Sequence, residues 1–143
     1  MDGSQQFQRQ IIHLVRAFGW HRPMMTPCGL PVSIAEAHAI MILSQNDLIT
    51  QNQLCASLNL SKSTVSRLVG KLVKRGWVNK QKDKIDRRAV QLSLTVVGIK
   101  KAEELARARR QKLNSIWNHL SVFEQNQLSS ALGNLLKAVH AQN

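Results

Sequence analysis

The chain has 143 residues, of which 43% are hydrophobic, and this suits a single domain of ordinary size. Its 20 Lys and Arg residues outnumber 8 Asp and Glu residues, for a formal net charge of +12, and this balance favours a polyanionic partner. No apolar run approaches the roughly 20 residues of a membrane span, the N-terminus has no signal-peptide pattern and the two cysteines form no disulfide framework, so we expect a cytoplasmic protein without a membrane partner.

The first part of the chain predicts three helices. Periodic apolar residues predict a helix over residues 5–18, and a stretch rich in proline then indicates a loop. Ser33 and Glu36 have the spacing of a capping box, which predicts the start of a second helix. Thr50 and Gln53 repeat this spacing and predict a short third helix.

Residues 61–74 predict an amphipathic helix with an unusual outer face. Its inner face follows the helical spacing, with Val65, Leu68, Val69, Leu72 and Val73. Its outer face carries hydrogen-bond donors and no carboxylate, with Lys62, Ser63, Thr64, Ser66, Arg67, Lys71 and Lys74. A basic surface kept for solubility is the alternative, but solubility does not require that carboxylates be missing from one face. With the turn at residues 59–61, where Ser61 is the expected cap, the third and fourth helices form a helix-turn-helix.

A basic hairpin follows this helix. Two short strands are predicted at residues 77–80 and 90–94, and a charged tip joins them. Residues 62–88 contain ten basic and two acidic side chains, a net +8. A helix faced with donors and followed by a basic hairpin can enter one groove of DNA and touch the next. We therefore expect a mainly α fold with a small β wing, and double-stranded DNA as the partner.

Two further helices complete the chain. Thr95 is the expected cap of a long helix that ends near residue 120, with its inward side at Leu105, Leu113, Ile116, Trp117 and Leu120. Ser121 and Glu124 form a capping box for a last helix with the apolar stripe Leu128, Leu132, Leu135, Leu136 and Val139. No globular body remains to cover this stripe or that of the first helix, so we expect a homodimer, with packing inside one chain as the alternative.

Two motifs resemble the MarR family of bacterial winged-helix transcription regulators. Asp86–Gly98, D-R-R-A-V-Q-L-S-L-T-V-V-G, is similar to the wing and wing exit of this family. Leu54–Val69 is similar to its helix-turn-helix, with Cys55 where an alanine is usual. The resemblance covers nearly the whole chain. It implies a single MarR-type domain over residues 1–143, with a winged helix-turn-helix core at about 33–98 and N- and C-terminal dimerisation helices at about 5–20 and 96–141.

The resemblance also implies how DNA is bound. The recognition helices of a homodimer would enter successive major grooves of a pseudo-palindromic operator, with centres about 34 Å apart. Arg88 would reach into the minor groove from the wing tip, and Asp86 would fix its guanidinium; an ordinary phosphate contact is the alternative for Arg88. The expected DNA-binding residues are Lys62, Ser63, Thr64, Ser66, Arg67, Lys71, Lys84, Asp86, Arg87 and Arg88. Arg67 and Lys71 could contact phosphate or a guanine edge, and the protein could repress or activate.

Regulators of this kind often respond to a small aromatic or phenolic ligand, an oxidant or a metal. The expected effector-binding residues are His13, Trp20, Met24, Cys28 and His38, whose mixture of side chains suits an organic molecule. Oxidant sensing through Cys28 is one alternative. Zinc sensing through Cys28, Glu36, His38 and His119 is another, but their spacing matches no ligand signature, so we predict no metal and no cofactor. An architectural DNA-binding protein without an effector also remains possible.

An enzyme is the competing class of protein. Catalysis would need a nucleophile or an acid/base group that a third residue orients. The acidic residues of this chain lie in the wing, at helix caps, near helix ends or, for Glu103 and Glu104, on the long helix. Neither a Gly-rich phosphate loop nor a paired-carboxylate pattern is present. We therefore expect that the protein is not an enzyme.

Overall fold

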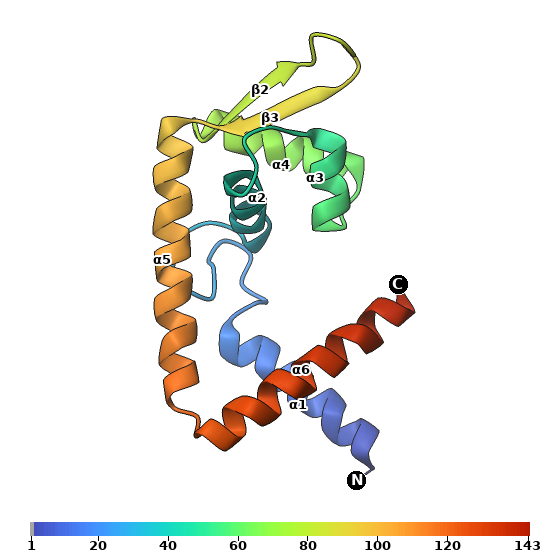
Figure 1. The fold of residues 1–143 in the computed structure, drawn as a ribbon, viewed down its shortest axis with the longest axis vertical. Helices are drawn as coiled ribbons and strands as arrows, with labels where there is room; N and C mark the ends of the chain where they lie inside the picture. The colour runs from blue at the N-terminus through green and yellow to red at the C-terminus, as the bar shows by residue number, and fades with distance from the viewer. Residues whose placement is uncertain (1) are drawn as a thin grey trace. The chain divides into compact units, whose positions relative to one another are not determined.

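The computed structural model describes residues 2–143 and divides the chain into two compact units, which meet in sequence at Ala108 and Arg109. The first unit holds α1 (Gly3–Phe18), α2 (Ile34–Ser44), β1 (Ile49–Thr50), α3 (Gln51–Leu58), α4 (Lys62–Lys74), β2 (Val78–Lys82) and β3 (Val90–Leu94). The boundary falls within α5 (Val96–Asn118), and α6 (Val122–Gln142) belongs to the second unit (Figure 1). Within residues 2–143, no helix has the length and apolar character that crossing a membrane requires.

The predicted caps begin the helices. The capping boxes at Ser33, Thr50 and Ser121 are complete, because each hydroxyl accepts the backbone N–H three residues on while the Glu or Gln there reaches back. Ser61 caps α4 by accepting the N–H of Thr64 at 3.2 Å. The first helix begins earlier than predicted, since Asp2 accepts the N–H of Gln5 at 2.9 Å and serves as its cap.

The wing is part of a three-stranded antiparallel sheet with the order β1-β3-β2. Strand β2 is shifted from its prediction, because pairing runs from Val78 opposite Leu94 to Lys82 opposite Val90. Strand β1 was not predicted, since it has only two residues, Ile49 and Thr50, and is a strand because it pairs with β3. The β2–β3 hairpin projects beyond the helices of the first unit (Figure 1).

The core of the first unit lies between α2, α3, α4 and the sheet. Its fully buried side chains include Ile40, Leu54, Val65, Val69, Leu72 and Leu92, each worth about 1.5–3 kcal/mol on burial. Val73, predicted on the inner face of α4, is instead 39% exposed. Packing against α3 and β2 centres the buried side of α4 on Leu68, Val69 and Leu72, and this leaves Val73 at the edge.

The terminal helices α1 and α6 leave most of their apolar side chains at least partly exposed to solvent. Neither α1 nor α6 has a buried residue over its described length. On α5, Leu105 is buried as predicted. Leu113, Ile116 and Trp117, also predicted to face inward, are 36–47% exposed, so residues 2–143 cover them only in part.

Candidate nucleic-acid interface

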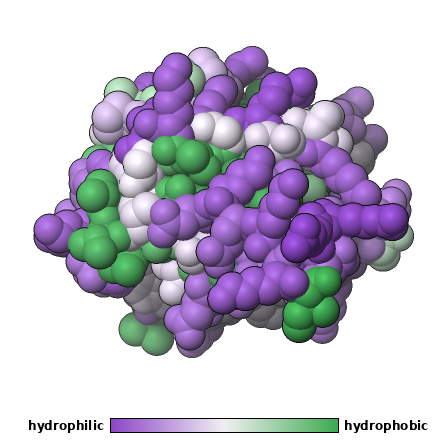
Figure 2. All heavy atoms as spheres, turned by 90° about the horizontal axis from the view of Figure 1, so that it is seen from above, coloured by the Kyte–Doolittle hydropathy of each residue, from purple (hydrophilic) through white to green (hydrophobic). Residues whose placement is uncertain are grey.

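Helix α4 is anchored by one face and presents the other to solvent. Val65, Leu68, Val69 and Leu72 are buried, and this fixes the rotation of the helix about its axis. The predicted DNA-binding residues of the helix lie on the opposite side, where Lys62, Ser63, Ser66, Arg67 and Lys71 are exposed. Figure 2 looks down on the end of the molecule that carries the wing, where hydrophilic side chains cover most of the surface and apolar ones form small separate patches.

Some of the predicted DNA-binding hydroxyl groups instead make hydrogen bonds within the N-terminal cap of α4. The Ser61 hydroxyl lies 2.7 Å from that of Thr64 and 3.3 Å from that of Ser63. Thr64 is half-buried, so its hydroxyl serves the cap first. Lys62, Ser66, Arg67 and Lys71 have no such local partner among the described residues and can turn to a ligand.

The preceding turn sets the direction of α4. Asn59 ends α3 in the left-handed conformation, with φ of 54°, which Asn tolerates better than most residues. The N–H of Leu60 then donates to the carbonyl of Cys55 at 3.2 Å. Cys55, which stands where an alanine is usual in similar sequences, is buried. The turn therefore holds α3 and α4 packed against each other.

Asp83 organises the wing tip, a role that was not predicted from the sequence. Its Oδ1 accepts the N–H groups of Ile85 at 2.8 Å and Asp86 at 3.3 Å, and its Oδ2 accepts Nε2 of Gln91 at 2.7 Å. These donors, led by the N–H of Ile85, lower the pKa of the Asp83 carboxyl below its usual value. The tendency of Asp to accept hydrogen bonds from the backbone two residues on was the available signal.

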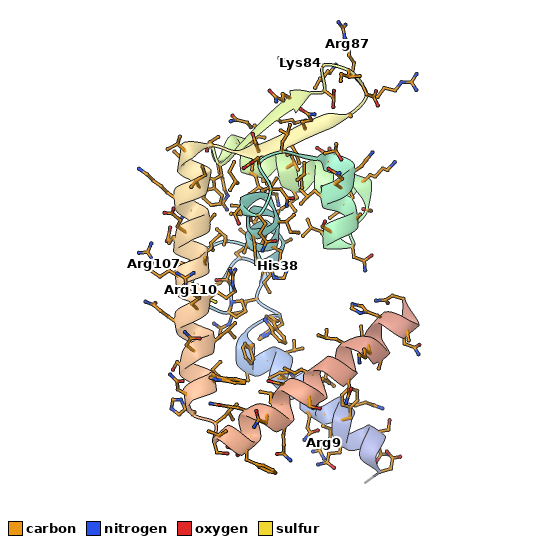
Figure 3. The ribbon with its side chains drawn as sticks, viewed as in Figure 1. Arg9, His38, Lys84, Arg87, Arg107 and Arg110 are labelled. Atoms are coloured by element: carbon orange, nitrogen blue, oxygen red, sulfur yellow. The ribbon has the colours of Figure 1, made fainter. Side chains whose placement is uncertain are left out.

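Asp86 makes a different contact from the one that the resemblance implied. Its Oδ1 accepts the backbone N–H of Arg88 at 3.0 Å and does not hold the guanidinium. The ion pairs found among residues 2–143 join Arg75 to Glu36 and Lys101 to Glu104, so none holds Arg88. A two-residue step in a tight turn brings the carboxylate to the neighbouring backbone, while the long Arg side chain extends into solvent. Lys84 and Arg87 lie at the free end of the wing (Figure 3).

An ion pair between a buried carboxylate and a partly exposed guanidinium supports the C-terminal end of α4. Glu36 is 2% exposed, and its Oε2 lies 2.9 Å from Nε of Arg75, outside the angles of a hydrogen bond but well within ion-pair distance. The Arg75 guanidinium also covers the Trp77 ring at 4.7 Å. From α5, the Lys101 ammonium lies 5.2 Å from the same ring. The sequence pattern predicted Glu36 as part of a capping box, and its second contact ties α2 to the C-terminal end of α4.

The predicted effector residues are spread over the N-terminal part of the first unit. His13 and His38 are exposed, Cys28 is half-buried, and Trp20 stacks on Phe18 with centroids 4.8 Å apart. Met24 lines a pocket of about 310 Å³ together with Glu36, Lys71, Lys74 and Arg75. Of the predicted set, Met24 is thus the residue that the structure brings next to the end of α4.

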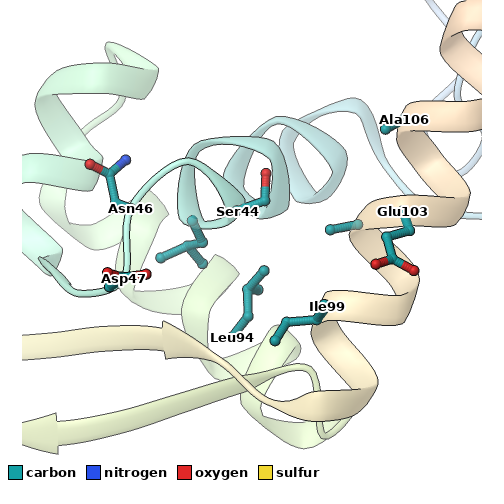
Figure 4. A pocket seen from close by; sticks show the side chains of 9 residues that line it. Ser44, Asn46, Asp47, Leu94, Ile99, Glu103 and Ala106 are labelled. Atoms are coloured by element: carbon teal, nitrogen blue, oxygen red, sulfur yellow. The ribbon is translucent and has the colours of Figure 1, made fainter.

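A second pocket, of about 400 Å³, lies between α2, the end of β3 and the start of α5 (Figure 4). Its lining combines apolar residues with polar ones: Leu43, Ser44, Asn46, Asp47, Leu94, Ile99, Ala102, Glu103 and Ala106. Within the described chain, the side chains of Asp47 and Glu103 have no hydrogen-bond or ion-pair partner. From the sequence, both acids were expected only as residues near helix ends or on the long helix.

The residues considered for zinc sensing do not form a cluster within residues 2–143. Across residues 2–143, no three or more His, Cys, Asp or Glu side chains lie together as metal ligands. Glu36, one of the four residues considered, is instead buried against Arg75. His119 has its Nδ1 2.7 Å from the carbonyl oxygen of Ser115 on its own helix.

One family model and several transcription regulators match parts of this chain. The model of the MarR family matches residues 32–90. The transcriptional repressor MprA of Escherichia coli K12 is 27% identical over 79% of this chain and 64% of its own length. The transcriptional regulator AdcR of Streptococcus pneumoniae is 30% identical over 64% of this chain and 63% of its own length. The matches therefore span slightly less than two thirds of these relatives.

Solved structures show the same fold over almost the whole chain. The crystal structure of Streptococcus pneumoniae FabT in complex with DNA has a TM-score of 0.76 at 20% identity and covers 97% of this chain and 96% of its own. The predicted fold class, mainly helical with a winged helix-turn-helix, is confirmed.

Proposed function

We propose that the chain is a transcription regulator of the MarR family, whose model matches residues 32–90, and that it binds DNA sequence-specifically, as a homodimer on a pseudo-palindromic operator. The observation that carries this proposal is the exposed side of α4. Buried residues fix the helix on one side, and the other side offers donors without a carboxylate. The family is one of transcription regulators and not of enzymes, as the sequence predicted.

The two basic elements take different roles in this proposal. Helix α4 enters the major groove, where Arg67 and Lys71 can reach a base edge or a phosphate. Lys84, Arg87 and Arg88 on the wing approach the adjacent minor groove, whose negative potential favours Arg. The exposed side chains and the extended wing support this assignment.

Selection of duplexes from a random pool tests the proposal. The protein should enrich two inverted half-sites about one helical turn apart, and its affinity should fall as salt is raised. Salt-dependent binding without an enriched sequence would point to an architectural protein, and this outcome would contradict sequence-specific regulation.

Arg67→Ala separates the two possible contacts of Arg67. If Arg67 grips a base edge, binding should weaken by about 1–3 kcal/mol and preference should relax at one position in each half-site. If it grips phosphate, affinity should fall evenly across sequences and the salt slope should become shallower. Unchanged binding would remove Arg67 from the interface.

We also propose that a small organic molecule modulates DNA binding. The pocket of about 400 Å³ falls in the size range of ligand sites and has apolar walls. Its two unpartnered carboxylates, Asp47 and Glu103, favour a neutral or cationic ligand over the phenolic one that the sequence suggested. The pocket joins α2 to α5, so a bound molecule would act on the elements that carry α4 and the wing.

A ligand screen on the DNA complex tests this second proposal. Compounds that release a labelled operator should include organic cations, and the Asp47→Asn, Glu103→Gln double variant should lose that response while it keeps operator affinity. An aromatic acid that releases DNA equally from both proteins would place the effector elsewhere.

A further inference from the structure

The wing tip carries an apolar side chain at its most exposed point. Ile85 is 98% exposed, more than any other large hydrophobic residue of the described chain. It stands between Lys84 and Asp86, and Arg87 and Arg88 follow directly. Single exposed apolar residues are ordinary on protein surfaces, so exposure alone decides nothing. Two further features distinguish Ile85: hydrogen bonds hold the loop backbone that carries it, and basic side chains flank it.

The backbone beneath Ile85 is held by its neighbours. The N–H groups of Ile85 and Asp86 both donate to Oδ1 of Asp83. The N–H of Asp83 donates to the carbonyl of Ala89 at 2.9 Å, and the N–H of Ala89 donates to that of Asp86 at 2.9 Å. The loop is therefore closed on itself, and Ile85 projects from a fixed base.

The side chain itself suits insertion into a narrow space. Isoleucine is branched at Cβ, which restricts χ1 and lowers the entropy lost when the side chain is immobilised. The long side chains of Lys84, Arg87 and Arg88 lose more freedom but can reach the phosphates on either side. Cations would thus hold the wing on the backbone of the duplex while an apolar group faces the groove floor.

We propose that Ile85 is an apolar wedge that enters the minor groove and packs into a base step. This proposal rests on the proposed DNA-binding function and adds a specificity-determining residue to it. Apolar side chains inserted from the minor groove partly unstack a step, and pyrimidine–purine steps unstack at the lowest cost. Ile85 therefore selects a flexible step beneath each wing, where no base-edge hydrogen bond is made.

Three variants of the full-length protein test the wedge. Ile85→Ser removes the apolar group, Ile85→Leu keeps its volume, and Val96→Ser removes an exposed apolar group outside the wing. Each is compared with the wild type on an operator selected by the wild type at fixed salt. Affinity, the base composition of selected flanks and the fluorescence of 2-aminopurine at the flanking step are measured. The thermal midpoint checks that every variant is folded.

Ile85→Ser should bind about tenfold more weakly, since the burial of an aliphatic side chain is worth about one decade of affinity. It should also lose the enrichment of pyrimidine–purine steps and the rise in 2-aminopurine fluorescence. Ile85→Leu and Val96→Ser should keep all three. If Ile85→Ser retains the affinity and flank preference of the wild type, the wedge is refuted while DNA binding stands. If the wild type binds no duplex in a salt-dependent way, the proposed function fails and the wedge fails with it.

Discussion

The basic wing tip carries two aspartates, and both carboxylates accept hydrogen bonds from the backbone of the loop. Asp83 accepts the N–H groups of Ile85 and Asp86, and Asp86 accepts that of Arg88. Each carboxylate thus satisfies backbone donors that a seven-residue connection cannot pair within the β ladder. The two carboxylates reduce the net positive charge of the wing, but their hydrogen bonds hold the loop that carries its basic side chains in one conformation.

The first prediction separates the charge of Asp86 from its hydrogen bond. Asp86→Ala should weaken operator binding by about 1 kcal/mol, because the Arg88 N–H loses its acceptor and the loop loosens. Asp86→Asn keeps an oxygen at Oδ1 and removes a negative charge, so it should bind at least as tightly as the wild type. Fluorescence anisotropy at fixed salt measures both. Tighter binding by Asp86→Ala would show that the tip acts only through its charge.

The second prediction concerns the pH dependence of the wing tip. The pKa of Asp83 is lower in the folded loop than in the unfolded chain, first because of the Ile85 N–H and then because of the Asp86 N–H. The stabilisation is therefore complete above the ordinary pKa of an Asp carboxyl, about 3.9, and is lost as the pH falls through the lowered folded value.

Amide chemical shifts check this dependence. The amide protons of Ile85 and Asp86 should hold their positions at neutral pH and move together only in strong acid. In Asp83→Asn, which keeps an acceptor without a titratable group, that movement should be absent. A shared transition near neutral pH would contradict the role of Asp83.

At the scale of elements, the junction of the wing with α5 gives a physical reason for Thr95 and Gly98, which lie in the motif that resembles the wing exit of the MarR family. The Thr95 hydroxyl donates to the carbonyl of Gly76 at 2.6 Å and accepts the N–H of Gly98 at 2.9 Å. The N–H of Thr95 donates to the carbonyl of Trp77 at 3.0 Å. These hydrogen bonds hold the first turn of α5 against the backbone of Trp77, which follows α4, and only glycine fits at position 98.

The third prediction uses two glycines as a matched pair. A Cβ at Gly98 would collide with the carbonyl oxygen and carbon of Trp77, which are backbone atoms and cannot turn aside. Gly98→Ala should lower the free energy of unfolding by about 1–3 kcal/mol. Gly70, within α4, has open space around its Cβ position, so Gly70→Ala should raise it by about 0.4–1 kcal/mol. Denaturant unfolding measures both, and equal effects would contradict the close contact.

For the whole molecule, the largest exposed apolar stripes lie on the terminal helices α1 and α6. α6 exposes Leu128, Leu132, Leu136 and Val139, and α1 exposes Phe7, Ile12 and Leu14. Side chains of this size seldom stay in water along an entire helix. A second copy of the chain would cover them, and a two-fold dimer also matches the inverted half-sites of the proposed operator.

The fourth prediction tests the dimer. Leu132→Asp places a charge in the proposed interface and should yield a monomer that has lost tight operator binding. Leu48→Asp is the control, because Leu48 is 46% exposed, like Leu132 at 45%, but lies outside the terminal helices. Sedimentation equilibrium gives the mass of each variant. A wild type that is monomeric at micromolar concentration would refute the homodimer.

The sequence by itself determined that the helices exist, most of their caps, the helix-turn-helix and the hairpin, but not the Asp2 cap of α1 or the exact bounds of β2. Ser33 with Glu36 and Thr50 with Gln53 could be predicted because a cap and its partner are three residues apart, and the buried face of α4 because helical spacing repeats along one segment. The donor-rich side of α4 follows from the same spacing, so a local pattern is enough to predict most of the candidate site.

Only the tertiary structure decided which distant residues meet. Glu36 is buried against Arg75, the two-residue strand β1 exists through its pairing with β3, and the carboxylates Asp47 and Glu103 share one pocket. Such contacts between distant residues depend on how the elements pack and on the register of the sheet, and no local pattern in the chain records either.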